Sequence, residues 1–127
     1  MRLDAIQPSQ LYISAEKLAA IEAAWDATDP GALPPIPIKV MDGRLMVTDG
    51  HTRGVALVRA GYEEAWAIWE AEEWDWEAYR ICVQWCLGVG ISSMLDLTDR
   101  IVDPATYRRL WLDRCHRMHE ALAASQD

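Results

Sequence analysis

The stretch 38–61 constrains the fold most, because two Asp-Gly dipeptides separate three apolar runs in it. The first run alternates as a strand does. Asp42-Gly43 favours a two-residue hairpin turn, so the second run is predicted to return as an antiparallel strand. Asp49-Gly50 then bends the chain into a predicted helix that ends at Gly61. A hairpin that leads directly into a helix indicates an α+β fold with a small mixed sheet.

The second Asp-Gly bend brings Gly50, His51, Thr52 and Arg53 to the first turn of that helix. The free amides and the positive end of the helix dipole suit an anion such as phosphate. Glycine allows a ligand to approach the backbone closely, and arginine offers a planar fork of donors for phosphate oxygens. The alternative is that Asp49 caps the helix while the polar side chains face solvent. Short motifs are common by chance, so the residues alone leave both interpretations open.

Composition narrows the class of protein. The chain of 127 residues can bury a core, and its 51% hydrophobic and 25% charged residues are typical of a globular protein. A formal net charge of −8 repels a phosphate backbone, so DNA is not an expected partner. No apolar run approaches the roughly 20 residues that span a bilayer, so no membrane association is expected. Three cysteines form no disulfide framework, which predicts a cytoplasmic protein.

The remaining segments alternate helices and loops. Residues 3–6 are predicted to form a short strand at most, and residues 64–70 a longer one. Ser14, Asp75 and Asp103 are predicted to cap helices at 15–27, at 76–87 and from Pro104 onward, and Ser92 or Ser93 a short helix between 91 and 102. The segment 26–37 holds four of the six prolines and is predicted to be a connection, with a pocket edge as the alternative. We therefore predict a domain at 1–72 and a helical extension at 73–127 packed on it.

This order of parts, with Asp49-Gly50-His51-Thr52-Arg53 at the strand-to-helix turn, resembles the ParB/sulfiredoxin-like superfamily. The similarity covers about residues 3 to 70. It includes the extended Ile6-Gln7-Pro8-Ser9-Gln10-Leu11, the Pro-Ile-Pro-Ile-Lys-Val strand and the hairpin before the motif. The helical remainder is similar to that of small bacterial ParB-like domains. The resemblance implies a ParB/sulfiredoxin-like α+β fold.

In that superfamily the turn holds the phosphates of a nucleotide, so the resemblance implies binding of ATP, ADP or CTP by Gly50, His51, Thr52 and Arg53. ParB proteins carry Gly-Glu-Arg-Arg here and bind and hydrolyse CTP. Sulfiredoxins carry Gly-Cys-His-Arg, and because His51 stands where their nucleophilic cysteine would be, sulfiredoxin activity is not expected. The free serine kinases carry Asp-Gly-His-His-Arg, which differs from this chain only at Thr52. Their base is a glutamate in the first extended segment, where this chain has Gln10, and an amide cannot accept that proton.

If the protein is an enzyme, we expect nucleotide hydrolysis or phosphoryl transfer. Arg53 would stabilise charge on the phosphoryl oxygens, and His51 would donate or shuttle a proton. Asp49 would hold Mg²⁺, orient His51 or cap the helix, and Gln10 would contact the nucleotide. The alternatives are a non-catalytic protein-interaction module that uses its acidic, Trp-rich surface, and a DNA-associated partition-like protein, which the net charge disfavours.

Two further groups of residues have a functional and a structural interpretation. Cys82 and Cys86, and likewise Cys115 and His119, are four residues apart on predicted helices, so they could form a tetrahedral zinc site. Cys86 lies on an apolar stripe, however, and the short spacing of zinc knuckles is missing, so core packing is favoured and zinc is not expected. The tryptophans between 66 and 76 are likewise predicted to pack in the core, with base stacking or partner binding as the alternative.

Overall fold

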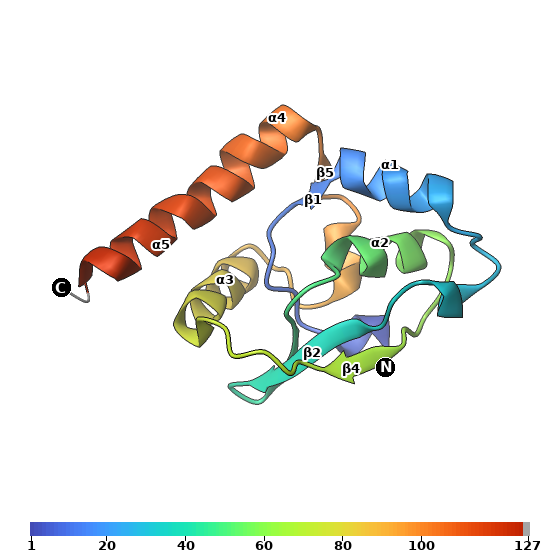
Figure 1. Cartoon of the computed structure of the whole chain (residues 1–127), viewed down its shortest axis with the longest axis horizontal. Coiled ribbons are helices and arrows are strands. Elements are labelled where there is room, and N and C mark those ends of the chain that lie inside the picture. Colours follow the sequence, from blue (N-terminus) through green and yellow to red (C-terminus); the bar gives the residue numbers. More distant parts are fainter. Residues whose placement is uncertain (126–127) are drawn as a thin grey trace.

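A small mixed sheet with helices packed against it forms the centre of the computed structural model, which describes residues 1–125 (Figure 1). The fold is α+β, as the sequence predicts. In chain order the elements are η1 (Leu3–Ala5), β1 (Ile13–Ser14), α1 (Ala15–Ala24), η2 (Pro30–Ala32), β2 (Ile36–Met41), β3 (Arg44–Val47), α2 (His51–Arg59), β4 (Ala67–Trp69), α3 (Trp76–Gly88), η3 (Met94–Leu97), β5 (Ile101–Val102), α4 (Pro104–Tyr107), the π-helical η4 (Arg108–Leu112) and α5 (Asp113–Ser125).

The predicted hairpin is confirmed. Strands β2 and β3 are antiparallel, and the turn between them has positive φ angles at Asp42 (50°) and Gly43 (79°), as a type I′ turn requires. Strand β4 pairs in parallel with the other side of β2, which gives the order β3-β2-β4. A separate two-stranded sheet joins β1 to β5 in parallel, although the two strands lie at opposite ends of the sequence.

Local capping signals set most helix boundaries. The side chains of Ser14, Asp75 and Asp103 accept hydrogen bonds from the amides at the start of α1, α3 and α4, as predicted. Ser93 and Asp96 form a capping box around η3.

Two strand predictions were wrong in extent or type. Residues 3–5 form a 3₁₀ turn, and the predicted strand 64–70 is reduced to β4 at 67–69 and an isolated antiparallel bridge between Glu64 and Arg2.

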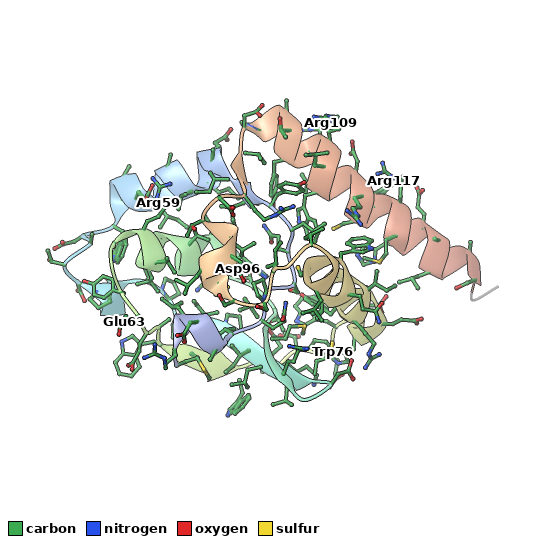
Figure 2. The ribbon with its side chains drawn as sticks, turned by 180° about the vertical axis from the view of Figure 1, so that it is seen from behind. Arg59, Glu63, Trp76, Asp96, Arg109 and Arg117 are labelled. Atoms are coloured by element: carbon green, nitrogen blue, oxygen red, sulfur yellow. The ribbon has the colours of Figure 1, made fainter. Side chains whose placement is uncertain are left out.

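One hydrophobic core contains residues from both ends of the chain. Its fully buried side chains include Leu3, Ile6 and Ile13 from the first segment, and Ile91 and Leu97 from the region after α3. A second cluster, built on Met41, Met46 and Val83, lies where α3 packs against the hairpin, with Trp76 beside it (Figure 2). The predicted division at residue 72 stays a prediction, while the shared core joins the two parts.

The predicted core packing of the tryptophans was wrong for three of them. Trp66, Trp69 and Trp74 are 69%, 65% and 50% exposed. Trp69 lies in β4 and Trp66 directly precedes it. This strand is at one edge of the sheet, whereas α3 packs against the β2–β3 hairpin. Strand alternation predicted opposite faces for Trp66 and Trp69, but it could not show that both would be left uncovered.

None of the helices within residues 1–125 is long and apolar enough to cross a membrane.

Candidate functional site

The start of α2 carries no side-chain cap. Gly50 occupies the N-cap position in the left-handed region (φ 83°), and the first helical hydrogen bond runs from the Gly54 amide to the Gly50 carbonyl. Asp49 does not cap the helix, so that alternative was wrong; its carboxylate is 82% exposed and lies 3.7 Å from Nη2 of Arg53. The amides of residues 51–53 precede the first helical bond, so the positive end of the dipole is not neutralised by a cap.

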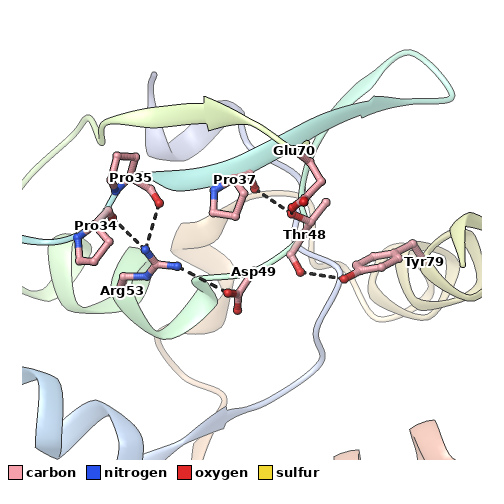
Figure 3. Close-up of polar contacts among 8 residues, drawn as sticks. All are labelled: Pro34, Pro35, Pro37, Thr48, Asp49, Arg53, Glu70 and Tyr79. Carbon is pink, nitrogen blue, oxygen red and sulfur yellow. Dashed lines mark hydrogen bonds and ion pairs between the residues drawn. The ribbon is translucent and has the colours of Figure 1, made fainter. Parts of the chain in front are cut away.

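Arg53 attaches the proline-rich segment to this turn. Its Nη1 atom donates to the carbonyl oxygens of Pro34 and Pro35, each at 3.0 Å (Figure 3). A Cβ atom placed on Gly50 would lie 2.7 Å from Nη2 of Arg53, so the guanidinium lies directly over the turn. The segment predicted as a plain connection therefore positions the arginine of the motif. The two carbonyls occupy Nη1 and leave Nη2 facing the turn.

His51 is buried and neutral. Its Nε2 atom accepts a hydrogen bond from the Ser9 amide at 2.9 Å, which assigns the proton of the neutral ring to Nδ1. Burial lowers the pKa of His51 to about 4, and the nearby Asp49 only partly opposes this effect. At neutral pH the ring therefore supplies no positive charge. Its bond to Ser9 instead holds the first extended segment against the turn, and Ser9 Oγ extends the contact to the Val47 carbonyl at 2.7 Å.

A polar cluster beside the turn has no counterpart in the sequence analysis. Thr48 Oγ1 donates to Glu70 Oε2 at 2.5 Å, and Tyr79 donates to the Thr48 carbonyl at 3.0 Å (Figure 3). The bond from Thr48 and a second one from the Glu72 amide lower the pKa of Glu70, so this carboxylate is ionised at neutral pH. Burial, with the charges of Glu70 and Asp49, raises the pKa of Tyr79 to about 12. No local pattern could reveal the cluster, since Thr48 follows β3, Glu70 follows β4 and Tyr79 lies in α3.

Two hollows open on either side of the turn. The smaller has a volume of about 310 Å³ and lies between the turn and helices α3 and α5; the larger, of about 510 Å³, lies against β4. Thr48, Trp74 and Tyr79 line both. His51 and Trp111 line only the smaller one, and Asp49 only the larger. Of residues 49–53, His51 thus lines the smaller cavity, which is rich in aromatic side chains, and Asp49 lines the larger hollow.

The other predicted site residues take different positions. Thr52 lies half-buried at the second position of α2. Gln10 lines the smaller cavity, but its Nε2 atom already donates to the Tyr12 carbonyl at 2.8 Å and to the Tyr107 hydroxyl at 3.0 Å. The structure thus places Asp49, His51 and Arg53 around one turn, and Gln10 lines the smaller cavity together with His51.

The cysteines form a pair and a separate core residue. The Cys82 thiol on α3 and the Cys115 thiol on α5 interact. This interaction, with burial, raises the pKa of Cys82, and the same interaction lowers the pKa of Cys115 although burial opposes that effect. His119 lines the same cavity as this pair, whereas Cys86 is completely buried in the core. Within residues 1–125 no group of three or more His, Cys, Asp or Glu side chains is arranged to hold a metal ion.

No family model, curated protein or solved structure matches the chain. The turn, the two hollows and the charges around them are the features of the structure that bear on function.

Proposed function

We propose that the protein binds a nucleotide, with the phosphates on the first turn of α2 and the nucleoside in the aromatic cavity beside it. The observation that carries this proposal is the uncapped helix start at the left-handed Gly50. Backbone amides at such a start point outward and favour a bound anion. The resemblance of the motif to the phosphate-binding turn of the ParB/sulfiredoxin-like superfamily supports the same assignment.

Both backbone amides and a side chain of the turn would bind the phosphate. The amides of residues 51–53 donate to its oxygens, and Arg53 adds a charged donor through Nη2, which lies over Gly50. Asp49 and Glu70 would repel a polyphosphate without a cation between them. Mg²⁺ prefers one or two carboxylates together with phosphate oxygens and water, and the exposed Asp49 carboxylate fits that role. We therefore expect binding to require Mg²⁺.

The cavity suits the nucleoside part of the ligand. Trp74, Tyr79 and Trp111 line it, and aromatic side chains stack on nucleotide bases. His51 faces this cavity as a neutral ring, so it can donate a hydrogen bond from Nδ1 but is a poor proton source for a leaving group. Nucleotide binding or sensing, with slow hydrolysis at most, agrees better with this geometry than rapid phosphoryl transfer to an acceptor.

Titration of ATP, ADP and CTP, with Mg²⁺ and with EDTA, tests the proposal by calorimetry. At least one nucleotide should bind saturably with Mg²⁺, and Arg53→Ala should weaken that binding about thirtyfold, because a charge-assisted hydrogen bond is worth roughly 2 kcal/mol. Arg53→Lys should recover only part of the affinity, since a lysine lacks the planar fork.

Arg59→Ala is the matched control. Arg59 lies on the same helix, but its side chain is at the surface, paired with Glu22 at 3.1 Å (Figure 2). This variant should retain the wild-type affinity. Absence of saturable binding for all three nucleotides, or equal affinity in the Arg53→Ala variant, would show that the turn is not a phosphate site.

A further inference from the structure

Two cysteine side chains meet where α5 packs against α3. Cys82 lies one turn before Trp85 on α3, and Cys115 lies one turn after Trp111 along the last helical segment. The two tryptophan rings pack edge to face with their centroids 6.2 Å apart, and Cζ of Arg114 lies 4.1 Å from the centroid of the Trp85 ring. Beside these contacts the thiols of Cys82 and Cys115 interact across the helix interface.

The pair can be reached from solvent through the smaller cavity. Cys82 and Cys115 both line it, and so do the exposed residues Asp75 and His119. The cavity volume of about 310 Å³ admits hydrogen peroxide, which is only slightly larger than water, a molecule that occupies about 30 Å³ in the liquid. Cys86, one turn further along α3, is by contrast completely buried in the hydrophobic core.

The two thiols of the pair differ in reactivity. Cys115 is half-buried, whereas Cys82 is only 7% exposed. The contact with Cys82, and more weakly the charge of Arg114, lower the pKa of Cys115, although burial opposes them. The contact with Cys115 and burial raise the pKa of Cys82. Because the thiolate is the form that attacks a peroxide, Cys115 is the expected nucleophile and Cys82 the thiol that reacts second.

We propose that Cys82 and Cys115 are a redox-active dithiol, which hydrogen peroxide oxidises to a disulfide that cross-links α5 to α3. The Cys115 thiolate attacks a peroxide oxygen, so an S–O bond forms, the O–O bond breaks, and the leaving hydroxide takes up a proton to become water. The Cys82 sulfur then attacks the sulfenic acid on Cys115. An S–S bond forms, the S–O bond breaks, and the Cys82 proton leaves with the hydroxyl group as a second water.

The cross-link secures a helix that few buried side chains hold in place. Helix α5 runs along one side of the molecule, and Met118 is the buried residue within 113–125 (Figure 1). An element with so few buried apolar contacts opens locally at a low cost in free energy. A disulfide at Cys115 restrains this opening, because it limits the conformations of the opened segment. The wall of the cavity that Cys115 and Met118 form is then fixed.

Oxidation of the fully reduced native protein with a small molar excess of hydrogen peroxide tests this inference. Peptide mass spectrometry after alkylation should find one intramolecular disulfide, between Cys82 and Cys115, with Cys86 left as a free thiol, and dithiothreitol should reverse it. In the Cys82→Ala variant, dimedone should trap a sulfenic acid on Cys115. In the Cys115→Ser variant, Cys82 should yield about tenfold less of this adduct, because it is less exposed and less ionised. Cys86→Ala is the matched control and should form the disulfide as the wild type does.

Limited digestion with trypsin measures how firmly α5 is attached. Arg117 is exposed on α5, two residues beyond Cys115, and it is cleaved when the helix opens (Figure 2). Cleavage there should be about tenfold slower in the oxidised protein than in the reduced one. The Cys115→Ser variant treated with peroxide should be cleaved as fast as the reduced wild type. The inference is overturned if peroxide gives disulfide-linked dimers, if Cys86 is oxidised as readily as the pair, or if oxidation leaves the cleavage rate at Arg117 unchanged.

Discussion

Replacing Gly50 with alanine is expected to lower the free energy of unfolding by about 3 kcal/mol, from a left-handed backbone penalty of roughly 1–2 and a steric cost of roughly 1–3. The φ angle of Gly50 is 83°, and the new Cβ would lie 2.7 Å from Nη2 and 2.9 Å from Cζ of Arg53. The guanidinium cannot move aside without breaking its bonds to Pro34 and Pro35. Urea unfolding followed by tryptophan fluorescence measures the loss.

Gly43→Ala separates the two contributions. Gly43 has a similar φ of 79°, but nothing lies within 4 Å of the Cβ position, so only the backbone penalty of about 1 kcal/mol is expected. In the Arg53→Ala background the steric part should vanish, and Gly50→Ala should then cost about as much as Gly43→Ala. Equal losses for the two glycine variants in the wild-type background would show that Arg53 does not press on the turn.

Stability is expected to depend on pH through His51. The folded pKa of about 4 lies below the ordinary value of 6.5, so between these values the unfolded chain binds a proton that the folded chain does not. The stability that the neutral His51 provides is therefore complete above about pH 6.5 and falls as the pH decreases toward 4. The loss over this window should reach about 3 kcal/mol.

Urea unfolding of the His51→Gln variant at a series of pH values isolates this contribution. The variant should lose about 3 kcal/mol less than the wild type over the same window, because glutamine does not titrate. His119→Gln is the control, since His119 is exposed on α5, and it should keep the wild-type pH dependence. Parallel curves for wild type and the His51→Gln variant would contradict the buried neutral imidazole.

The features that the sequence predicted correctly depend on neighbours within a few residues. Asp42-Gly43 specifies its turn because both residues tolerate positive φ angles, and Ser14, Asp75 and Asp103 cap helices that begin directly after them. The approximate extents of β2, β3, α2 and α3 follow from the same local rules. These features are enough to predict the α+β class.

The site depended on contacts that local patterns do not contain. Arg53 bonds carbonyls 18 and 19 residues away, and His51 accepts from an amide 42 residues away. Aspartate is a common N-cap residue, so Asp49 was a candidate cap. Gly50 takes the N-cap position instead, because its left-handed conformation turns the chain one residue later. The exposure of Trp66 and Trp69 depends on which face the later helices cover. The alternation of side chains along a strand predicts which residues share a face of the sheet, but it does not predict which element packs on that face.

The shared core has a consequence for biosynthesis. Gln7 donates to the carbonyl of Ile91, 84 residues later, and Arg100 donates to that of Leu11, 89 residues earlier. A ribosome adds roughly 5–20 residues per second, so the apolar side chains near the amino end wait for several seconds before their partners exist. The hairpin and α2 can form during this delay, but the core they help to enclose stays open. A nascent chain of this protein therefore exposes these apolar side chains until its final third has been translated.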